Sequence, residues 1–178
     1  KQFINEKQPL SPNNPYSASK AAAALMVQTW YKNFNFPSIN TNSVNNFGAF
    51  QFVEKFIPRS ILMVQKKGVI EVYGKGKNIR TWIGAKYHAD ALIFLAQKGY
   101  VGETYNIASC HKFRNIDLAN KIIKIFNKKN IDAKVRLVAD RPGHDRHYSI
   151  DSRKINQLGW KSKFNFDLEL EATVNWYL

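Results

Sequence analysis

The chain has 178 residues and a formal net charge of +14, with 44% hydrophobic and 13% aromatic residues, which is enough for one globular core. The longest apolar run, Ala21 to Val27, is too short to span a membrane, so we expect a soluble, cytoplasmic protein with no membrane partner. The single cysteine, Cys110, excludes an internal disulfide and fits a reducing compartment.

The positive charge makes nucleic acid a candidate partner, because clustered lysines and arginines attract phosphates. The lysines are instead scattered, with one loose cluster at residues 121–129, and no nucleic-acid-binding motif accompanies them. We therefore expect a main function other than nucleic-acid binding. An anionic small substrate or a lysine-rich compositional bias accounts for the charge.

A long helix is predicted near the start of the chain. Residues 1–15 carry three prolines and predict a loop, and an alanine-rich stretch then favours a helix from Tyr16 to Phe34. On that helix Tyr16 and Lys20 share a face, and a nearby ammonium favours the ionised phenol that takes a proton from a hydroxyl group. This spacing arises by chance about one time in three in such a lysine-rich chain. A helix-end tyrosine and a surface lysine remain the alternative.

The rest of the chain alternates between strand and helix patterns. Residues 37–44 predict a short buried strand and residues 45–48 a turn after it, at the kind of strand end where open α/β sheets bind ligands. Pro58 interrupts a helix predicted over residues 53–67, which Gly68 ends. Further strands are predicted at 69–73, 81–83, 104–107 and 135–138, and further helices at 85–97, 115–127, 151–158 and 166–178, with Asn115 or Asp117 and Asp151 or Ser152 as N-caps.

This alternation predicts an α/β fold. A complete dinucleotide-binding fold begins with a βαβ unit that carries a Gly-rich fingerprint at its first turn. The sequence contains no such fingerprint, and Gly74 and Gly76 follow an internal strand instead. We therefore expect these residues to be the back part of an enzyme whose front part precedes them.

Several stretches carry a resemblance to a known family. Residues 15–20, Pro-Tyr-Ser-Ala-Ser-Lys, resemble the active-site helix of the extended short-chain dehydrogenase/reductases that act on nucleotide sugars. Four more stretches narrow the resemblance to the dTDP-glucose 4,6-dehydratases: residues 45–58, Val72-Tyr73-Gly74 with Arg80 and Trp82, residues 102–107 and, most specific, Asp140 to Arg146.

The resemblance implies the latter part of a Rossmann-like NAD(P)-binding fold plus a small α/β substrate-binding domain. Residues 1–45 would end the Rossmann-like domain with the Tyr/Lys helix. Residues 46–178 would form mainly the nucleotide-sugar-binding region, with returns to the Rossmann sheet.

The same resemblance implies an NAD-dependent lyase that acts on dTDP-glucose. The implied reaction oxidises the sugar at C4, eliminates water across C5 and C6 and returns the hydride to C6, which gives dTDP-4-keto-6-deoxyglucose. It also implies a homodimer and no metal.

The resemblance assigns roles to individual residues. Tyr16 and Lys20 are implied to be catalytic and to contact NAD, and Asn46 is implied to contact NAD. Guanidinium groups suit a diphosphate through charge-assisted hydrogen bonds, although a single arginine is often only a solvated surface residue. The implied substrate-binding residues are Asn45, Lys55, Phe56, Glu71, Val72, Tyr73, Arg80, Asn115, Asp140, Arg141, Pro142, Gly143 and His144.

The chain also departs from the family sequence near these residues. Glu71 stands where the family usually has Pro, Thr81 stands where it has Asp, and residues 84–88 lack an acidic residue at the helix start. The Asp and Glu pair that the family uses for elimination does not occur in these 178 residues. Two alternatives stay open: a UDP-sugar epimerase or dehydratase of the same superfamily, and a truncated, non-catalytic nucleotide-sugar-binding module.

Overall fold

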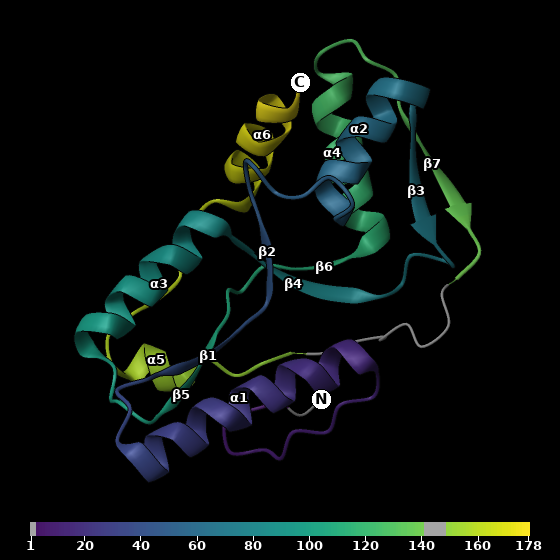
Figure 1. The fold of residues 1–178 in the computed structure, drawn as a ribbon. Coiled ribbons are helices and arrows are strands. Elements are labelled where there is room, and N and C mark those ends of the chain that lie inside the picture. The colour runs from purple at the N-terminus through teal and green to yellow at the C-terminus, as the bar shows by residue number, and fades with distance from the viewer. Residues whose placement is uncertain (1–2, 141–148) are drawn as a thin grey trace.

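The structure is a computed structural model that describes residues 3–140 and 149–178, and it confirms the α/β class (Figure 1). Helices and strands alternate along most of the chain. The described elements are α1 (Pro15–Phe34), β1 (Asn40–Ser43), β2 (Asn45–Phe47), α2 (Phe56–Lys67), β3 (Val69–Tyr73), β4 (Ile79–Gly84), α3 (Ala85–Lys98), β5 (Thr104–Ile107), β6 (Lys112–Arg114), α4 (Asn115–Asn127), β7 (Lys134–Val138), α5 (Arg153–Gln157) and α6 (Phe166–Tyr177).

Two short strands follow one another through the middle of the molecule. β1 pairs in parallel with β5, and β2 pairs in parallel with β4. Between them, Val44 donates its backbone N–H to the carbonyl oxygen of Ile107 at 3.2 Å. Residues 40–47 thus form an almost continuous strand with two successive partners, and the turn predicted at residues 45–48 is wrong for residues 45–47. Pairing with β4 extends the strand, and the chain turns only from Gly48.

Two hydrophobic cores lie on opposite sides of this central strand. We call α2, β3, α4, β7 and α6 the upper lobe, and α1, β1, α3, β5 and α5 the lower lobe (Figure 1). β4 serves both cores, because successive side chains of a strand point to opposite faces. Trp82 packs with Phe47 in the upper core, whereas Ile83 packs with Val44 in the lower core.

The remaining strands belong to the upper side of the molecule. β3 pairs in parallel with β7, and β4 pairs in antiparallel fashion with β6. The sequence pattern missed β6, whose three residues are too few to show a period. β6 leads directly into α4. Asn115, the first residue of α4, therefore lies next to β4.

Helix ends follow local chemistry at most positions. α1 begins at Pro15, and the Asn14 side chain accepts a hydrogen bond from the Ser17 N–H at 2.9 Å. α2 begins at Phe56, so Pro58 lies in its first turn, where a missing N–H costs nothing, and does not interrupt the helix. Gly68 ends α2 in the left-handed conformation, as predicted.

One predicted cap is wrong and another is confirmed. Asn115 is the first residue of α4 and its N-cap, Arg114, makes no side-chain capping bond, while Asp117 forms an ion pair with Arg114 at 2.7 Å. An arginine next to the helix start competes for the carboxylate that was expected to cap it. At α5, where Asp151 or Ser152 was predicted, Ser152 is at the N-cap without a side-chain bond, and the Asp151 side chain accepts from the Arg153 N–H at 2.9 Å.

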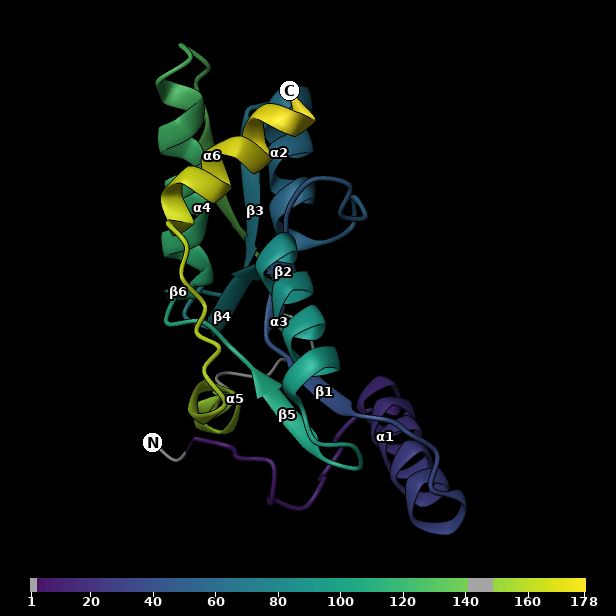
Figure 2. The same ribbon diagram turned by 90° about the vertical axis from the view of Figure 1, so that its left-hand side faces the viewer.

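α1 is the most exposed helix of the lower lobe. Both ribbon views place it along the lower edge beside β1, and none of its residues, all of which are described, is buried (Figures 1 and 2). Polar contacts hold it: Gln28 donates to the Thr104 hydroxyl at 3.4 Å and Asn40 donates to the Ala24 carbonyl at 3.1 Å. Among the described residues no helix, α1 included, has the length and apolar character needed to cross a membrane.

The turn between β3 and β4 gives a test of the fold. Gly76 has a φ of 65°, and a Cβ atom there would lie 2.8 Å from side-chain atoms of Ile116 and Val72, whereas Gly159 has a φ of 112° and nothing within 4 Å of an added Cβ. We expect Gly159→Ala to lower the free energy of unfolding by about 1 kcal/mol through backbone strain, and Gly76→Ala by about 3 kcal/mol through strain and overpacking. Urea denaturation of both variants measures this difference. Equal losses would contradict the close packing around residue 76.

Candidate active site

A cavity of about 170 Å³ lies in the upper lobe, between α2 and the strands β3 and β4. Side chains from β2, α2, β3, β4 and α4 line it. The cavity brings together six predicted substrate-binding residues that are far apart in the sequence: Asn45, Phe56, Glu71, Tyr73, Arg80 and Asn115.

Five lining residues were not predicted: Glu54, Arg59, Ser60, Met63 and Trp82. Arg59 lies on the same face of α2 as Phe56, one helical turn further on. The helical spacing from Phe56 is the signal in the sequence that would have found it.

A charged network forms one wall of the cavity. Glu71 accepts hydrogen bonds from Arg59 at 2.7 Å through one carboxylate oxygen and from Arg136 at 2.6 Å through the other. Arg59 also donates to the Tyr73 hydroxyl at 3.2 Å. The hydrogen bond from Arg136, and then the positive charges of both arginines, lower the pKa of Glu71 despite its partial burial. Glu71 is therefore a carboxylate held between two guanidinium groups.

Arg80, on β4, is the other arginine among the described residues that line the cavity. Its side chain lines the cavity although the residue is only 9% exposed, and one of its nitrogens donates to the Ile79 carbonyl at 2.9 Å. A cation this far from solvent favours a negatively charged or strongly accepting ligand group. This end of the cavity therefore suits an anion.

Three other predicted substrate residues, Lys55, Val72 and Asp140, are not among the described residues that line the cavity. Lys55 is exposed and pairs with Glu54 at 3.0 Å, and Val72 is fully buried in the upper core. Asp140 packs against Gly74, where an added Cβ would lie 2.8 Å from its carboxylate. Arg141, Pro142, Gly143 and His144 lie outside the described residues.

The predicted catalytic pair lies elsewhere, on the first two turns of α1 in the lower lobe. Tyr16 is 75% exposed and Lys20 is also exposed. Asn46 lies next to Asn45 on β2 and donates to the Ser43 hydroxyl at 3.0 Å and to the Val44 carbonyl at 3.2 Å. Its side-chain oxygen is buried and accepts no hydrogen bond from the residues that the structure describes, so it can accept one from a ligand amide.

The segment between β2 and α2, residues 48–55, is tied to the C-terminal helix. The Tyr177 hydroxyl donates to the Gln51 carbonyl at 2.5 Å, and the rings of Phe50 and Trp176 lie 4.5 Å apart. Burial raises the pKa of the Tyr177 phenol, which keeps it protonated as a donor. Since Gln51 also donates to the Asn46 carbonyl at 2.8 Å, α6 supports the segment that joins two sides of the cavity.

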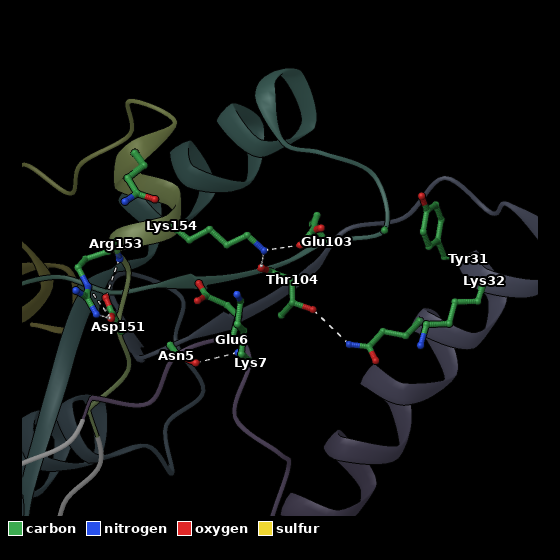
Figure 3. Close-up of a pocket in the computed structure, with 13 residues that line it drawn as sticks. Asn5, Glu6, Lys7, Tyr31, Lys32, Glu103, Thr104, Asp151, Arg153 and Lys154 are labelled. Atoms are coloured by element: carbon green, nitrogen blue, oxygen red, sulfur yellow. Dashed lines mark hydrogen bonds and ion pairs between the residues drawn. The ribbon is translucent and has the colours of Figure 1, made fainter.

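A second, larger cavity of about 720 Å³ lies between the N-terminal loop, α1 and α5 (Figure 3). Four of its charged side chains pair with each other: Lys154 with Glu103 at 2.6 Å and Arg153 with Asp151 at 2.6 Å. No predicted site residue is among the described residues that line it. The smaller cavity of the upper lobe is therefore our candidate ligand site.

Comparison with known proteins gives consistent similarities along the whole chain. A sequence profile described as GDP-mannose 4,6 dehydratase matches residues 1–173. A probable dTDP-glucose 4,6-dehydratase of Sinorhizobium fredii is 40% identical over 181 residues, which cover 98% of this chain and 52% of that protein. The chain spans about half the length of the curated relatives it matches.

Solved structures show the same similarity in three dimensions. The dTDP-glucose 4,6-dehydratase of Bacillus anthracis in complex with NAD has a TM-score of 0.89 and 36% identity, over 99% of this chain and 56% of that one. DesIV, a dTDP-glucose 4,6-dehydratase of Streptomyces venezuelae with NAD and TYD bound, has a TM-score of 0.92 and 32% identity, over 99% of this chain and 55% of that one.

The bond between α6 and residues 48–55 can be tested directly. We expect Tyr177→Phe to speed amide hydrogen exchange in this segment about fivefold, because one hydrogen bond of about 1 kcal/mol is lost. Hydrogen–deuterium exchange with mass spectrometry measures the effect. Tyr100→Phe, at a tyrosine that is 67% exposed, is the control and should leave the segment unchanged. Unchanged exchange in Tyr177→Phe would show that the ring contact alone holds the segment.

Proposed function

Since the chain belongs to the GDP-mannose 4,6 dehydratase family, we propose that the whole protein is an NAD-dependent dTDP-glucose 4,6-dehydratase that forms dTDP-4-keto-6-deoxyglucose. The 40% identity to a probable dTDP-glucose 4,6-dehydratase supports this choice of nucleotide and sugar within the family. In this proposal the chain supplies the Tyr/Lys helix and most of the nucleotide-sugar site.

The observation that carries the proposal is the convergence of six predicted residues on one cavity. A lining of aromatic, amide and guanidinium groups matches the three chemical parts of a nucleotide sugar. Arg80 suits the diphosphate, Phe56 and Tyr73 offer ring faces to the base, and Asn45 and Asn115 offer amides to hydroxyl groups. In this proposal Lys55, Asp140 and the stretch from Arg141 to His144 complete the substrate contacts.

Three residues of this chain fit NAD. The buried side-chain oxygen of Asn46 is an acceptor for the carboxamide of the nicotinamide, and Lys20 is a donor for its ribose. Bound NAD would supply the reversible two-electron oxidation at the sugar C4. Tyr16 and Lys20 lie one turn apart on α1, so the phenol and the ammonium can act on one ligand.

The proposed role of Tyr16 is that of a general base. Its phenolate oxygen takes the proton of the sugar C4 hydroxyl as that carbon is oxidised, and the Lys20 ammonium stabilises the ionised phenol. The exposed position of Tyr16 leaves its oxygen accessible to a sugar. Arg80 and the amides of the cavity hold the remainder of the substrate during this step.

We also propose a cytoplasmic homodimer. Met26, Trp30 and Phe34 share one face of α1 and are each more than half exposed, which supports a helical interface. The single cysteine, Cys110, is a free and exposed thiol, which supports a reducing compartment.

The diphosphate contact predicts a binding defect. We expect Arg80→Lys to weaken the binding of dTDP about tenfold, because an ammonium cannot make the paired hydrogen bonds of a guanidinium. Arg153→Lys, which changes an arginine on α5, is the matched control and should bind like the wild type. Isothermal titration calorimetry with dTDP, and with UDP in parallel, measures both. A wild-type chain that binds no dTDP, or binds UDP more tightly, would overturn the proposed substrate.

The catalytic assignment predicts a separate defect. In the complete native protein, Tyr16→Phe should lower turnover of dTDP-glucose at least about 100-fold, because the base is removed. The dissociation constant of dTDP should change less than about twofold, because Tyr16 is not among the described residues that line the cavity. Steady-state kinetics and calorimetry separate the two. Turnover at the wild-type rate would show that Tyr16 is not the base.

A further inference from the structure

The wall formed by Arg59, Glu71 and Tyr73 differs from the rest of the cavity. Arg59 is charge-paired with Glu71 at 2.7 Å, so its charge is offset within the lining itself. The Glu71 carboxylate offsets the positive charge of Arg59, so this wall attracts the diphosphate less than an arginine alone would. An uncharged ligand group that accepts hydrogen bonds suits this end better.

The geometry of Arg59 leaves donors for such a group. One terminal nitrogen donates to Glu71 and the other to the Tyr73 hydroxyl at 3.2 Å. A guanidinium carries five N–H donors in a rigid plane, so three remain beyond these two contacts. Because Arg59 lines the cavity, these donors are available to a planar ligand beside it.

The size of the cavity restricts what lies against this wall. About 170 Å³ is well below the roughly 300–1,000 Å³ of a cavity that holds a whole small-molecule ligand. Phe56, Met63 and Trp82 supply its apolar surface. One flat ring fits, with the rest of the nucleotide extending towards Arg80 and out of the cavity.

Two contacts with β3, to Glu71 and to Tyr73, hold Arg59 in place. Glu71 is only 19% exposed in its side chain, and it faces Arg136 directly across the β3–β7 pair. Arg136 donates a hydrogen bond to the second carboxylate oxygen of Glu71. It is not among the described residues that line the cavity. Glu71, which stands where the resembled family usually has Pro, therefore fixes the direction in which Arg59 points.

We propose that Arg59 is a specificity-determining residue that donates hydrogen bonds to the ring carbonyl of a pyrimidine base at position 4, and that Glu71 is the positioning residue that orients it. This inference rests on the proposed function, because Arg80 must hold the diphosphate for the far edge of the base to reach Arg59. A base with a carbonyl at position 4 is accepted. A base with an amino group at position 4 is rejected, because that amino group and the Arg59 guanidinium are both hydrogen-bond donors.

The test compares two nucleotides that differ only at ring positions 3 and 4, dUDP and dCDP. The wild-type chain should bind dUDP about tenfold more tightly than dCDP, because the amino group of cytosine cannot accept the hydrogen bonds that Arg59 donates. Arg59→Gln should reduce this ratio to about one. Glu71→Gln, which keeps the shape but removes the charge, should reduce it at least about threefold. Calorimetry gives the ratio, and thermal unfolding confirms that each variant folds.

Arg136→Gln is the matched control. It removes an ion pair with the same carboxylate, so it tests the purely structural role of the network, and the ratio should stay within about twofold of the wild type. A ratio that falls equally in Arg136→Gln and Arg59→Gln would overturn the proposal. Equal weakening of both nucleotides in Arg59→Gln would also overturn it, since Arg59 would then contact phosphate. A wild-type chain that binds neither nucleotide refutes the proposed function itself, which separates the two failures.

Discussion

Residues 40–47 hydrogen-bond first to β5 and then to β4, and this unbroken pairing fixes the two lobes relative to each other. The same run places Phe47 in the upper core and Val44 in the lower core. Asn45 is thereby presented to the cavity, and Asn46 lies next to it on β2. A slip of one residue in register would exchange Phe47 with a polar neighbour, so both cores specify the register that builds the site.

This run is also where reasoning from the sequence was least successful. Asn45 and Asn46 have the composition of a turn, because short amide side chains bond readily to nearby backbone. Parallel pairing with β4 overrides that local preference. The polar side chains find partners within the fold instead: Asn42 donates to the Asn106 side chain at 3.1 Å and Asn40 to the Ala24 carbonyl. Such partners depend on tertiary structure, and no sequence pattern reveals them.

The fold class, the long first helix and the strands at 69–73 and 104–107 were predictable, because their apolar spacing and their glycine and proline boundaries are local signals. The resemblance named six lining residues of the cavity. It did not name Arg59, whose importance appears only when α2 is packed against β3 and its guanidinium meets Glu71. Glu71 itself was predicted from the resemblance alone. Its two arginine partners, on α2 and β7, give a physical role to this residue.

The candidate site is thus divided between a well-packed part and a lightly held part. The cavity is built on the upper core, where Ile57, Ile61 and Leu118 are fully buried and each large side chain stabilises the fold by roughly 1.5–3 kcal/mol. The helix of Tyr16 has no buried residue and is attached by polar contacts, each of which contributes about 1 kcal/mol. The distance between the proposed base and the nucleotide is therefore set by β1 and its contact with α1, rather than by the packing of the cavity. Of the two, the position of the base is the more easily altered by mutation.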